Sequence, residues 1–402
     1  MARRLPFGLF SWRFLLPGQP ENVRIHRQLV WQHYPIIPRP LWLLVVLFGG
    51  VRWMLFYSPY YSYRALQRQW KKVHAETGLS YWQQGWQLFG ASMGHGIPPS
   101  AWYQYRLYLP DQQATCWDYI YDHEAGAYHA WRNQGRPNTA KHQALLADKW
   151  QLEQVLGASG ITMAQTLYFA RRGDSAFSDV LQRLSQQQGT LFCKQRTGNQ
   201  ARGAFLARWQ AGQLVIQPFG KALLQPPACK TFLQQRIAEA DYLIQPEYRN
   251  HPALTPDHDH LPAATLRIIS YCGQDNAITL GCAYLEWPMA DGEGHIHHFP
   301  LPILPLTGQV AMDALAGRTV TAEQQQALET LRHRLAGKPL PCWQEAVSMV
   351  TRGHQQLLGL YAIAWDFILT EDGAVLLEGN SGWRVSTPQL LQNAGLLMNP
   401  CY

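Results

Sequence analysis

The feature that most constrains this chain is a pair of apolar runs near its C-terminal end, joined by an Asp-Gly turn. Residues 361–370 and 374–378 read as two strands, and an Asp-Gly pair between such runs favours an antiparallel hairpin. The hairpin would bring Asp366 close to Glu378 and Asn380. The last two share one face, because strand side chains alternate with a period of two.

Two carboxylates and an amide oxygen at one strand end are hard ligands of the kind that suits Mg²⁺. A magnesium ion held by Asp366, Glu378 and Asn380 would bridge the phosphates of ATP and neutralise charge as the γ-phosphoryl group leaves. An ordinary hairpin with polar ends also explains this spacing. The pattern by itself leaves both interpretations open.

Lys194 ends a short predicted strand at 191–194 and precedes a loop, Arg196 to Gly203, of small, polar and basic residues. Such a loop lets backbone N–H groups approach phosphates, and a Lys at its root supplies charge. It is not a Walker A sequence, which needs Gly-Lys followed by Ser or Thr. A flexible basic hairpin loop is the alternative.

Three more segments carry polar groups where ligand contacts are plausible on chemical grounds. Lys149 stands at a helix start, and the apolar strand 242–245 ends in Gln245 and, after a proline, Glu247. Arg267 alternates with apolar neighbours on a predicted strand and could grip a phosphate or carboxylate with two hydrogen bonds. A surface lysine, an ordinary strand end and a structural ion pair are the respective alternatives.

From about residue 141 the chain mixes predicted helices and paired strands, which indicates an α+β or α/β fold with two sheets. We expect one helix over 141–156 and a strand over 161–170. A polar loop is expected around His295, His297 and His298. The other expected strands are 205–208, 214–216, 242–245, 265–272 and 277–287, and the other helices are 178–188, 232–240, 321–335 and 342–357.

Residues 1–110 are expected to be mainly helical and are unusually aromatic. Within them, the apolar run 41–57 is interrupted by Arg52 and two glycines and is shorter than a spanning helix requires. The aromatic and basic residues around it suit a helix lying in a membrane interface. A buried helix in a helical lobe explains the run about as well, and a true membrane span is the weakest interpretation.

The chain's 402 residues allow two or three lobes. A net charge of +7 is compatible with nucleic acid, an anionic membrane or phosphorylated ligands. No recognisable nucleic-acid-binding module occurs, so we expect no nucleic-acid partner. The seven cysteines are odd in number and form no CxxC pair, which favours reduced thiols in a cytosolic protein. The N-terminus is a poor signal peptide.

Taken together and in order, several segments make the chain resemble the ATP-grasp superfamily. It looks most like the sugar-transfer-associated branch, which is related to α-L-glutamate ligases. The resemblance covers about residues 140–390. The segments that carry it are Ala147-Asp148-Lys149, Cys193-Lys194, Ile244-Gln245-Pro246-Glu247, Ala264-Thr265-Leu266-Arg267, Ala364-Trp365-Asp366 and Leu377-Glu378-Gly379-Asn380.

The resemblance implies an α+β ATP-grasp fold in which two lobes clasp ATP. Lys149 and Lys194 would contact the α- and β-phosphates, and the strand ending at Gln245 and Glu247 would hold adenine and ribose. The loop from Arg196 through Gly198 to Gly203 would be the phosphate lid. Arg267 would steady the transferred phosphate and the acyl group. The magnesium ligands would be Asp366, Glu378 and Asn380.

Three parts are expected: a helical N-terminal region at 1–110, a first lobe with the lid at 111–245, and a second lobe with the metal site at 246–402. The implied reaction is ATP- and Mg²⁺-dependent ligation of a carboxylate to an amine through an acyl phosphate. The segment Gly294 to Leu304 replaces a stretch that often carries an Asp-Asn pair in relatives, so the substrate side departs from the family pattern.

The substrates would be a small carboxylate and an amine or sugar-linked acceptor, in cell-surface polysaccharide or envelope assembly. We expect a cytoplasmic location, at the inner face of the membrane if 41–57 contacts lipid. An ATP-dependent phosphotransferase shares the same nucleotide site and is one alternative. A catalytically inactive nucleotide-binding partner at the membrane is the other.

Overall fold

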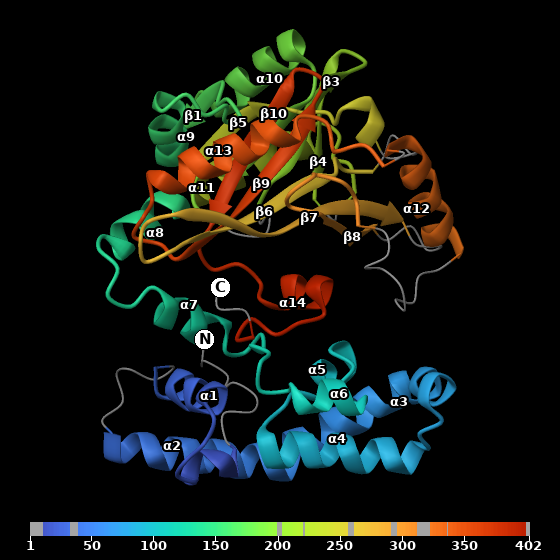
Figure 1. Ribbon diagram of the computed structural model, residues 1–402. Helices are drawn as coiled ribbons and strands as arrows, with labels where there is room; N and C mark the ends of the chain where they lie inside the picture. Colours follow the sequence, from blue (N-terminus) through green and yellow to red (C-terminus); the bar gives the residue numbers. More distant parts are fainter. Residues whose placement is uncertain are drawn as a thin grey trace. The chain divides into compact units, whose positions relative to one another are not determined.

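The computed structural model describes residues 11–32, 39–198, 203–219, 222–255, 261–290, 296–311, 322–335 and 337–398 (Figure 1). The chain divides into two compact units. The first unit contains Met1–Gly135 and Gly382–Tyr402, and the second contains Arg136–Ser381. The three-part division expected from the sequence stays a prediction.

The first unit is built from helices, as expected for an aromatic-rich helical N-terminal region. Its elements are η1 (Trp12–Leu15), α1 (Glu21–Gln32), α2 (Arg39–Arg52), the π-helical turn η2 (Trp53–Tyr57), α3 (Ser58–Thr77), α4 (Tyr81–His95), α5 (Pro99–Gln104), α6 (Pro110–Ala114), α7 (Ala125–Arg132) and α14 (Ser386–Gln392). Many of its aromatic side chains form one core, in which Trp102 and Tyr119 are almost fully buried. Aromatic residues are therefore numerous here partly because they fill this core.

Local sequence signals set the ends of the helices in this unit. Ser80 accepts a hydrogen bond from the backbone of Gln83, whose side chain bonds back to the Ser80 N–H, so α4 begins with a capping box. Gly78, in the left-handed conformation at φ 75°, ends α3. Pro59 lies in the first turn of α3, directly after the π-helical turn η2, where its fixed φ is compatible with the helical backbone.

The second unit contains two five-stranded antiparallel sheets. The first has the order β1-β5-β2-β3-β4. Its strands are β1 (Tyr168–Ala170), β2 (Leu191–Gln195), β3 (Phe205–Gln210), β4 (Gln213–Pro218) and β5 (Tyr242–Pro246). Helices α10 (Phe177–Gln188) and α11 (Ala228–Glu239) pack on one face of it and bury a common apolar core.

The second sheet has the order β10-β9-β6-β7-β8. Its core is formed with the helices of this part of the chain, and α13 lies against the sheet (Figure 1). The elements are α8 (Thr139–Ala147), α9 (Lys149–Ala158), η3 (Pro252–Leu254), β6 (Thr265–Cys272), β7 (Ile278–Ala290), β8 (Ile296–Ile303), α12 (Ala322–Leu335), α13 (Trp343–Gln355), β9 (Ala362–Thr370) and β10 (Gly373–Asn380).

The single helix expected over 141–156 is wrong, because the chain forms two helices that meet at Asp148. The backbone of Asp148 is extended (φ −102°, ψ 94°), and its side chain accepts a hydrogen bond from the Gln151 N–H at 3.1 Å. Asp148 thus caps α9 and ends α8. The break places Lys149 in the first turn of a helix.

The strand expected over 161–170 is wrong for most of its length, since only Tyr168–Ala170 is a strand. The preceding residues pass from one sheet to the other. Ala164 N–H donates to Leu376 O at 2.9 Å, whereas Leu167 N–H donates to Ile244 O at 2.8 Å. The backbone of this segment thus donates hydrogen bonds first to β10 and then to β5, so the segment lies between the two sheets.

The loop expected around the histidine-rich segment is also wrong where the structure describes it. His297 and His298 lie in β8, which pairs with β7, while His295 lies outside the described residues. As an edge strand, β8 exposes its polar N-terminal half to solvent while Leu301 and Ile303 are buried. Tertiary pairing overrides the polar appearance of the segment.

Candidate active site: a charged row across four strands

One row of directly paired residues crosses the second sheet. Tyr284 on β7 pairs with Arg267 on β6, Arg267 pairs with Asp366 on β9, and Asp366 pairs with Glu378 on β10. Directly opposite residues of neighbouring strands project from the same face. The register therefore brings Arg267 and two predicted metal ligands together on one face of the sheet.

A β-bulge in β10 decides which side chains reach this face. Leu376 is opposite Phe367, but two residues later Glu378 is opposite Asp366, so β10 gains one residue at Leu377. In a regular strand Leu377 would have been opposite Asp366. The extra residue shifts every later side chain to the other face and turns Glu378 toward Asp366.

Arg267 holds Asp366 with two short hydrogen bonds, Nε to Oδ1 at 2.5 Å and Nη2 to Oδ2 at 2.7 Å. Its Nη1 also lies 3.3 Å from Oε1 of Glu286 on β7. Burial raises the pKa of Asp366 to about 6; Arg267 opposes this rise and the charge of Glu378 adds to it. Asp366 is thus buried beside a second carboxylate, and the neighbouring Arg267 offsets part of the cost of its charge.

Asn380 joins the two carboxylates. Its amide nitrogen lies 3.2 Å from Asp366 Oδ2 and 3.3 Å from Glu378 Oε1, so a positively polarised group already occupies the point where the acids converge. With the amide turned so that its oxygen faces the same point, the two carboxylates and Asn380 would form an oxygen donor set that suits a hard divalent cation. Among the described residues no group of three His, Cys, Asp or Glu side chains could hold a metal ion, and this site too brings together only two such side chains, with the Asn380 amide as the third group.

Close packing explains why a glycine, Gly379, stands between Glu378 and Asn380. A Cβ on Gly379 would lie 2.9 Å from Leu146 Cδ2 and 3.1 Å from the ring of Trp365. Trp365 is fully buried and donates its indole N–H to Ser270 at 2.8 Å, so it has no freedom to give way. The absence of a side chain at 379 lets β10 approach the core closely at the site.

Lys194 and Lys149 reach this site from different elements. Lys194, on β2 of the first sheet, is 9% exposed, and its ammonium lies 3.5 Å from the carbonyl of Leu377, the bulged residue. Lys149, on α9, lies 3.5 Å from Glu378 Oε2. Burial lowers the pKa of Lys194 to about 8; Glu378 opposes this effect and Lys149 reinforces it. Lys149 and Lys194 thus both lie beside the acids, and burial disfavours the charged form of Lys194.

The described ends of the predicted lid are fixed. Arg196 forms a two-pronged ion pair with Asp148, with a shortest N–O distance of 2.6 Å, and it reaches Asp241 at 3.3 Å. Lys149 donates to Gly198 O at 2.6 Å, and Tyr242 donates to Gly203 O at 3.0 Å. Residues 199–202 of the lid lie outside the described residues.

Gln245 and Glu247 lie at the end of β5, next to the segment that crosses between the sheets. The Gln245 side chain is buried and donates to Ala164 O at 2.8 Å, so it positions that segment. Glu247 is half-buried and its N–H donates to Thr190 O at 3.0 Å. Their predicted contacts with adenine and ribose stay predictions.

Two acidic residues near the row were not among the site residues predicted from the sequence. Glu286 is a second carboxylate at the Arg267 guanidinium, and Glu153 on α9 raises the pKa of Lys194 by its charge. An acidic residue inside the apolar run Ala283–Trp287 is the signal that could have identified Glu286. Glu153 stands on a helix with no comparable signal.

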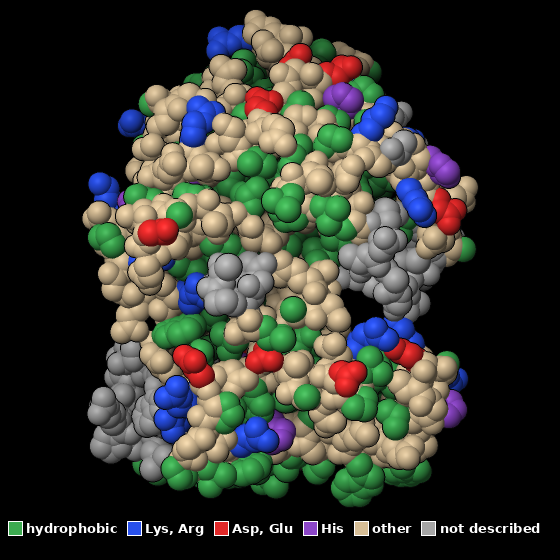
Figure 2. Space-filling view, in the orientation of Figure 1, with side chains coloured by type: hydrophobic (Ala, Val, Ile, Leu, Met, Phe, Trp, Pro, Cys, Tyr) green, Lys and Arg blue, Asp and Glu red, His purple; other side chains and the backbone are tan. Residues whose placement is uncertain are grey.

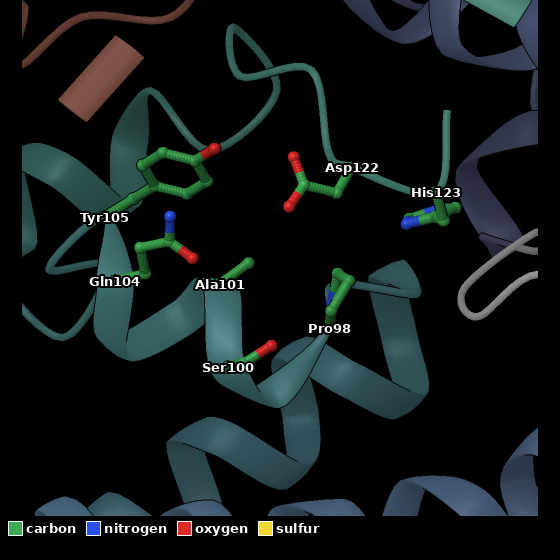
Figure 3. A pocket seen from close by; sticks show the side chains of 7 residues that line it. All are labelled: Pro98, Ser100, Ala101, Gln104, Tyr105, Asp122 and His123. Carbon is green, nitrogen blue, oxygen red and sulfur yellow. The ribbon is translucent and has the colours of Figure 1, made fainter. Parts of the chain in front are cut away.

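A separate small cavity of about 140 Å³ lies in the first unit (Figure 3). Its polar lining comes from α5 and from the segment that precedes α7. The polar residues are Ser100, Gln104, Tyr105, Asp122 and His123. None of the residues predicted from the sequence to bind ATP or metal lines this cavity.

The two antiparallel sheets and the row of acids between Arg267 and Asn380 define an α+β protein of the ATP-grasp fold. The pattern of the sugar-transfer associated ATP-grasp family matches residues 130–399, and the chain belongs to this family. No curated protein sequence matches the chain.

Solved structures similar to this chain include three that are named as ligases or synthetases. The ATP-grasp ligase PsnB complexed with minimal precursor is 13% identical, covers 77% of this chain and 78% of its own, and has a TM-score of 0.38. D-alanyl-alanine synthetase A from Vibrio cholerae is 14% identical over 64% of this chain and 67% of its own, with a TM-score of 0.32. D-cycloserine synthetase DcsG is 15% identical over 62% and 71%, also at 0.32.

Proposed function

We propose that the protein is an ATP- and Mg²⁺-dependent ligase that joins a carboxylate to an amine through an acyl phosphate. Membership of the ATP-grasp family supports the nucleotide, and one observation carries the placement of its phosphates. Lys194 is a buried ammonium whose contact within the described part of the chain is a long 3.5 Å approach to a carbonyl. A buried charge with so weak a partner suits an anionic ligand.

In this proposal Lys194 and Lys149 bind phosphate oxygens from two sides. The approach of a polyanion would raise the lowered pKa of Lys194 and keep the ammonium charged. Lys149, at the first turn of α9, would exchange its contact with the Gly198 carbonyl for the nucleotide. Gly198 and Gly203, at the ends of the predicted lid, would lie beside the phosphates, while the end of β5 at Gln245 and Glu247 would receive the base and ribose.

Asp366, Glu378 and Asn380 would hold magnesium, which when bound would neutralise charge on the phosphates. Arg267 keeps Asp366 ionised and oriented by two hydrogen bonds, and its remaining donors face Glu286. From that position the N–H groups of Arg267 that Asp366 does not take would steady the transferred phosphate and the acyl group by charge and hydrogen bonding.

The proposed chemistry has two balanced steps. A substrate carboxylate oxygen attacks the γ-phosphorus of ATP, the bond to the β-phosphate oxygen breaks, and ADP and an acyl phosphate result. The amine then attacks the acyl carbon and loses a proton, inorganic phosphate leaves, and an amide forms. The protein's contribution is positioning and charge neutralisation, and both depend on the rigid strand row.

The family's description as sugar-transfer associated supports a substrate in cell-surface polysaccharide or envelope precursor assembly. In this proposal the acid or the amine is a small molecule or a sugar-linked group, and the reaction takes place in the cytoplasm where ATP is available. None of the helices in the described part of the chain is long and apolar enough to cross a bilayer.

Thermal unfolding with ATP, in the presence and absence of Mg²⁺, tests the site directly. A ligand that binds only the folded state raises the apparent midpoint. We expect a magnesium-dependent ATP shift that is lost in Glu378→Gln. The control is Glu371→Gln, an exposed glutamate in the turn of the same hairpin, which should keep the shift.

Product analysis then separates the reaction classes. A ligase should release ADP and phosphate in quantity only when a carboxylate and an amine are both supplied, whereas a phosphotransferase should phosphorylate a hydroxyl with no amine present. An absence of any nucleotide shift in the wild type would refute the proposed site and favour an inactive partner protein.

A further inference from the structure

A stripe of exposed apolar side chains runs along α2 and η2 in the first unit. Its members follow helical spacing and are 54–66% exposed: Leu41, Leu44, Phe48, Val51 and Leu55. Figure 2 shows hydrophobic side chains gathered along one edge of this unit, over the elements that Figure 1 labels α2 and α4. A contiguous exposed apolar surface of this kind marks an interaction site.

Aromatic side chains extend the stripe onto neighbouring helices. Trp82 and Trp86 on α4 are 74% and 73% exposed, and Tyr60 and Tyr63 on α3 are more than half exposed. We call these four residues and the five of the stripe the apolar edge. Trp and Tyr with one polar end and one apolar end are enriched where protein meets the boundary of a bilayer.

The apolar edge is held rigid from behind. The indole N–H of Trp53, on η2, donates to Ser92 O on α4 at 3.0 Å, and Ser58 donates to Ser92 Oγ at 2.8 Å. Trp53, Leu66 and Leu88 are buried on the inner faces of the same helices. η2, α3 and α4 therefore each have a packed side, and the exposed residues named above are not part of the core of this unit.

The charge of this region is strongly one-sided. Residues 1–100 contain eleven Lys and Arg and two Glu, a net charge of +9, although the whole chain carries +7. Arg64, Arg68, Lys71 and Lys72 on α3 are exposed, and none of them pairs with an acid within the described residues. Unpaired cations beside an apolar face complement anionic lipid headgroups.

Two of the cations lie over aromatic rings next to the apolar edge. The Arg52 guanidinium is 4.8 Å from the ring centroid of Tyr57, and that of Arg64 is 5.6 Å from the ring centroid of Tyr60. These contacts keep positive charge at the margin of the apolar surface, where the long side chains can reach headgroups while their stems lie on apolar groups.

We propose that the apolar edge lies in the interface of a bilayer containing anionic lipids, with α2 parallel to the membrane plane. The occupant is lipid rather than a second copy of the chain, because two copies would bring two regions of net charge +9 together. A surface apolar in the middle, aromatic at its borders and basic beside them matches the layers of the lipid interface.

Vesicle co-sedimentation of the full chain tests this proposal. The probes are vesicles of phosphatidylcholine alone and vesicles with about 30% phosphatidylglycerol, each at low salt and at about 0.5 M salt. We expect binding to the anionic vesicles that weakens with salt. The double variant Phe48→Glu with Leu55→Glu should reduce the apparent affinity on the order of tenfold or more, since each change puts a charge in place of an exposed apolar group that would be buried in the lipid.

Two further variants make the result specific. Leu306→Glu changes an apolar residue of the second unit that is 93% exposed and should leave vesicle binding unchanged. Lys71→Gln with Lys72→Gln should lower the preference for anionic vesicles without touching the apolar edge. The magnesium-dependent ATP shift, measured on the same samples, should persist in all of them, so this proposal and the proposed function can fail separately.

Three outcomes would overturn the inference. The wild type could stay in the supernatant with both vesicle types, or the Phe48→Glu and Leu55→Glu variant could bind as strongly as the wild type. Light scattering could also show a dimer that this variant converts to a monomer without any vesicle binding, which would make a second copy the occupant.

Discussion

Replacing Lys194 by Met tests whether the buried ammonium exists for a ligand rather than for the fold. Burial lowers its pKa from 10.5 to about 8. Because one pKa unit corresponds to about 1.4 kcal/mol, the charged side chain makes the folded state about 3 kcal/mol less stable at pH 7 than an unperturbed lysine would. Met has a similar length and no charge, so Lys194→Met should raise the free energy of unfolding by roughly 1–3 kcal/mol.

The pH dependence of this difference has a defined sign. Below about pH 8 Lys194 is protonated in both the folded and the unfolded chain, and the full cost of burial is present. Between about pH 8 and 10.5 the folded chain releases the proton while the unfolded chain keeps it, so the wild type gains stability relative to the variant. The advantage of Lys194→Met should therefore shrink as the pH rises through this window.

Urea unfolding at pH 7 and at about pH 9.5 measures both effects. Lys230→Met, at an exposed position on α11, is the matched control and should change stability little at either pH. Lys194→Met should also abolish the ATP-dependent thermal shift. The proposed ligand role of Lys194 is refuted if Lys194→Met is less stable than the wild type at pH 7 while Lys230→Met leaves stability unchanged. Lys194 would then be a structural residue.

Three other substitutions test packing and charge. Gly379→Ala should destabilise the protein by roughly 1–3 kcal/mol and weaken the ATP shift, because a Cβ there meets the buried core; calorimetry and the shift assay measure both. Arg267→Met leaves Asp366 buried without its cation and should cost roughly 3–5 kcal/mol at pH 7 in urea unfolding. Burial opposes the charge of His26, but Glu124 outweighs it and raises the pKa of His26 above 6.5, so His26→Asn should cost more stability at about pH 6 than at about pH 9.

Each of these predictions has a clear contrary result. Gly157→Ala, at a helical position with open space around a Cβ, should be tolerated, and equal losses for both glycine variants would remove the packing argument. A loss of stability in Arg267→Met that disappears on adding Asp366→Leu would confirm the pair, and independent losses would contradict it. Equal costs of His26→Asn at both pH values would show that the ring contributes packing and not charge.

Local sequence determined the hairpin of β9 and β10. Apolar runs around an Asp-Gly turn leave an antiparallel pair as the favoured local structure, and period-two alternation puts Glu378 and Asn380 on one face. The strands expected over 205–208 and 214–216 likewise form the adjacent pair β3 and β4 of the other sheet. These features follow from contacts between residues close in sequence, which is why they could be predicted.

The placement of the charged row required the tertiary structure. The bulge at Leu377 depends on how β10 pairs with β9, and no residue type near it indicates that the strand contains an extra residue. Arg267 meets Asp366 across 99 positions of sequence, a pairing that strand order alone decides. The break at Asp148 is a middle case, since an Asp is a common cap but also tolerable within a helix.

The sequence by itself therefore determined which residue types could serve chemistry and where the local strands and most helices lie. It also determined that the N-terminal hundred residues are basic and aromatic. Only the tertiary structure decided that Lys194 from the first sheet and Lys149 from α9 meet the acids of the second sheet. It also decided that Leu41, Leu44, Phe48 and Val51 on α2 are exposed. Local propensity acts over a few residues, whereas register and burial are set by packing between segments far apart in the chain.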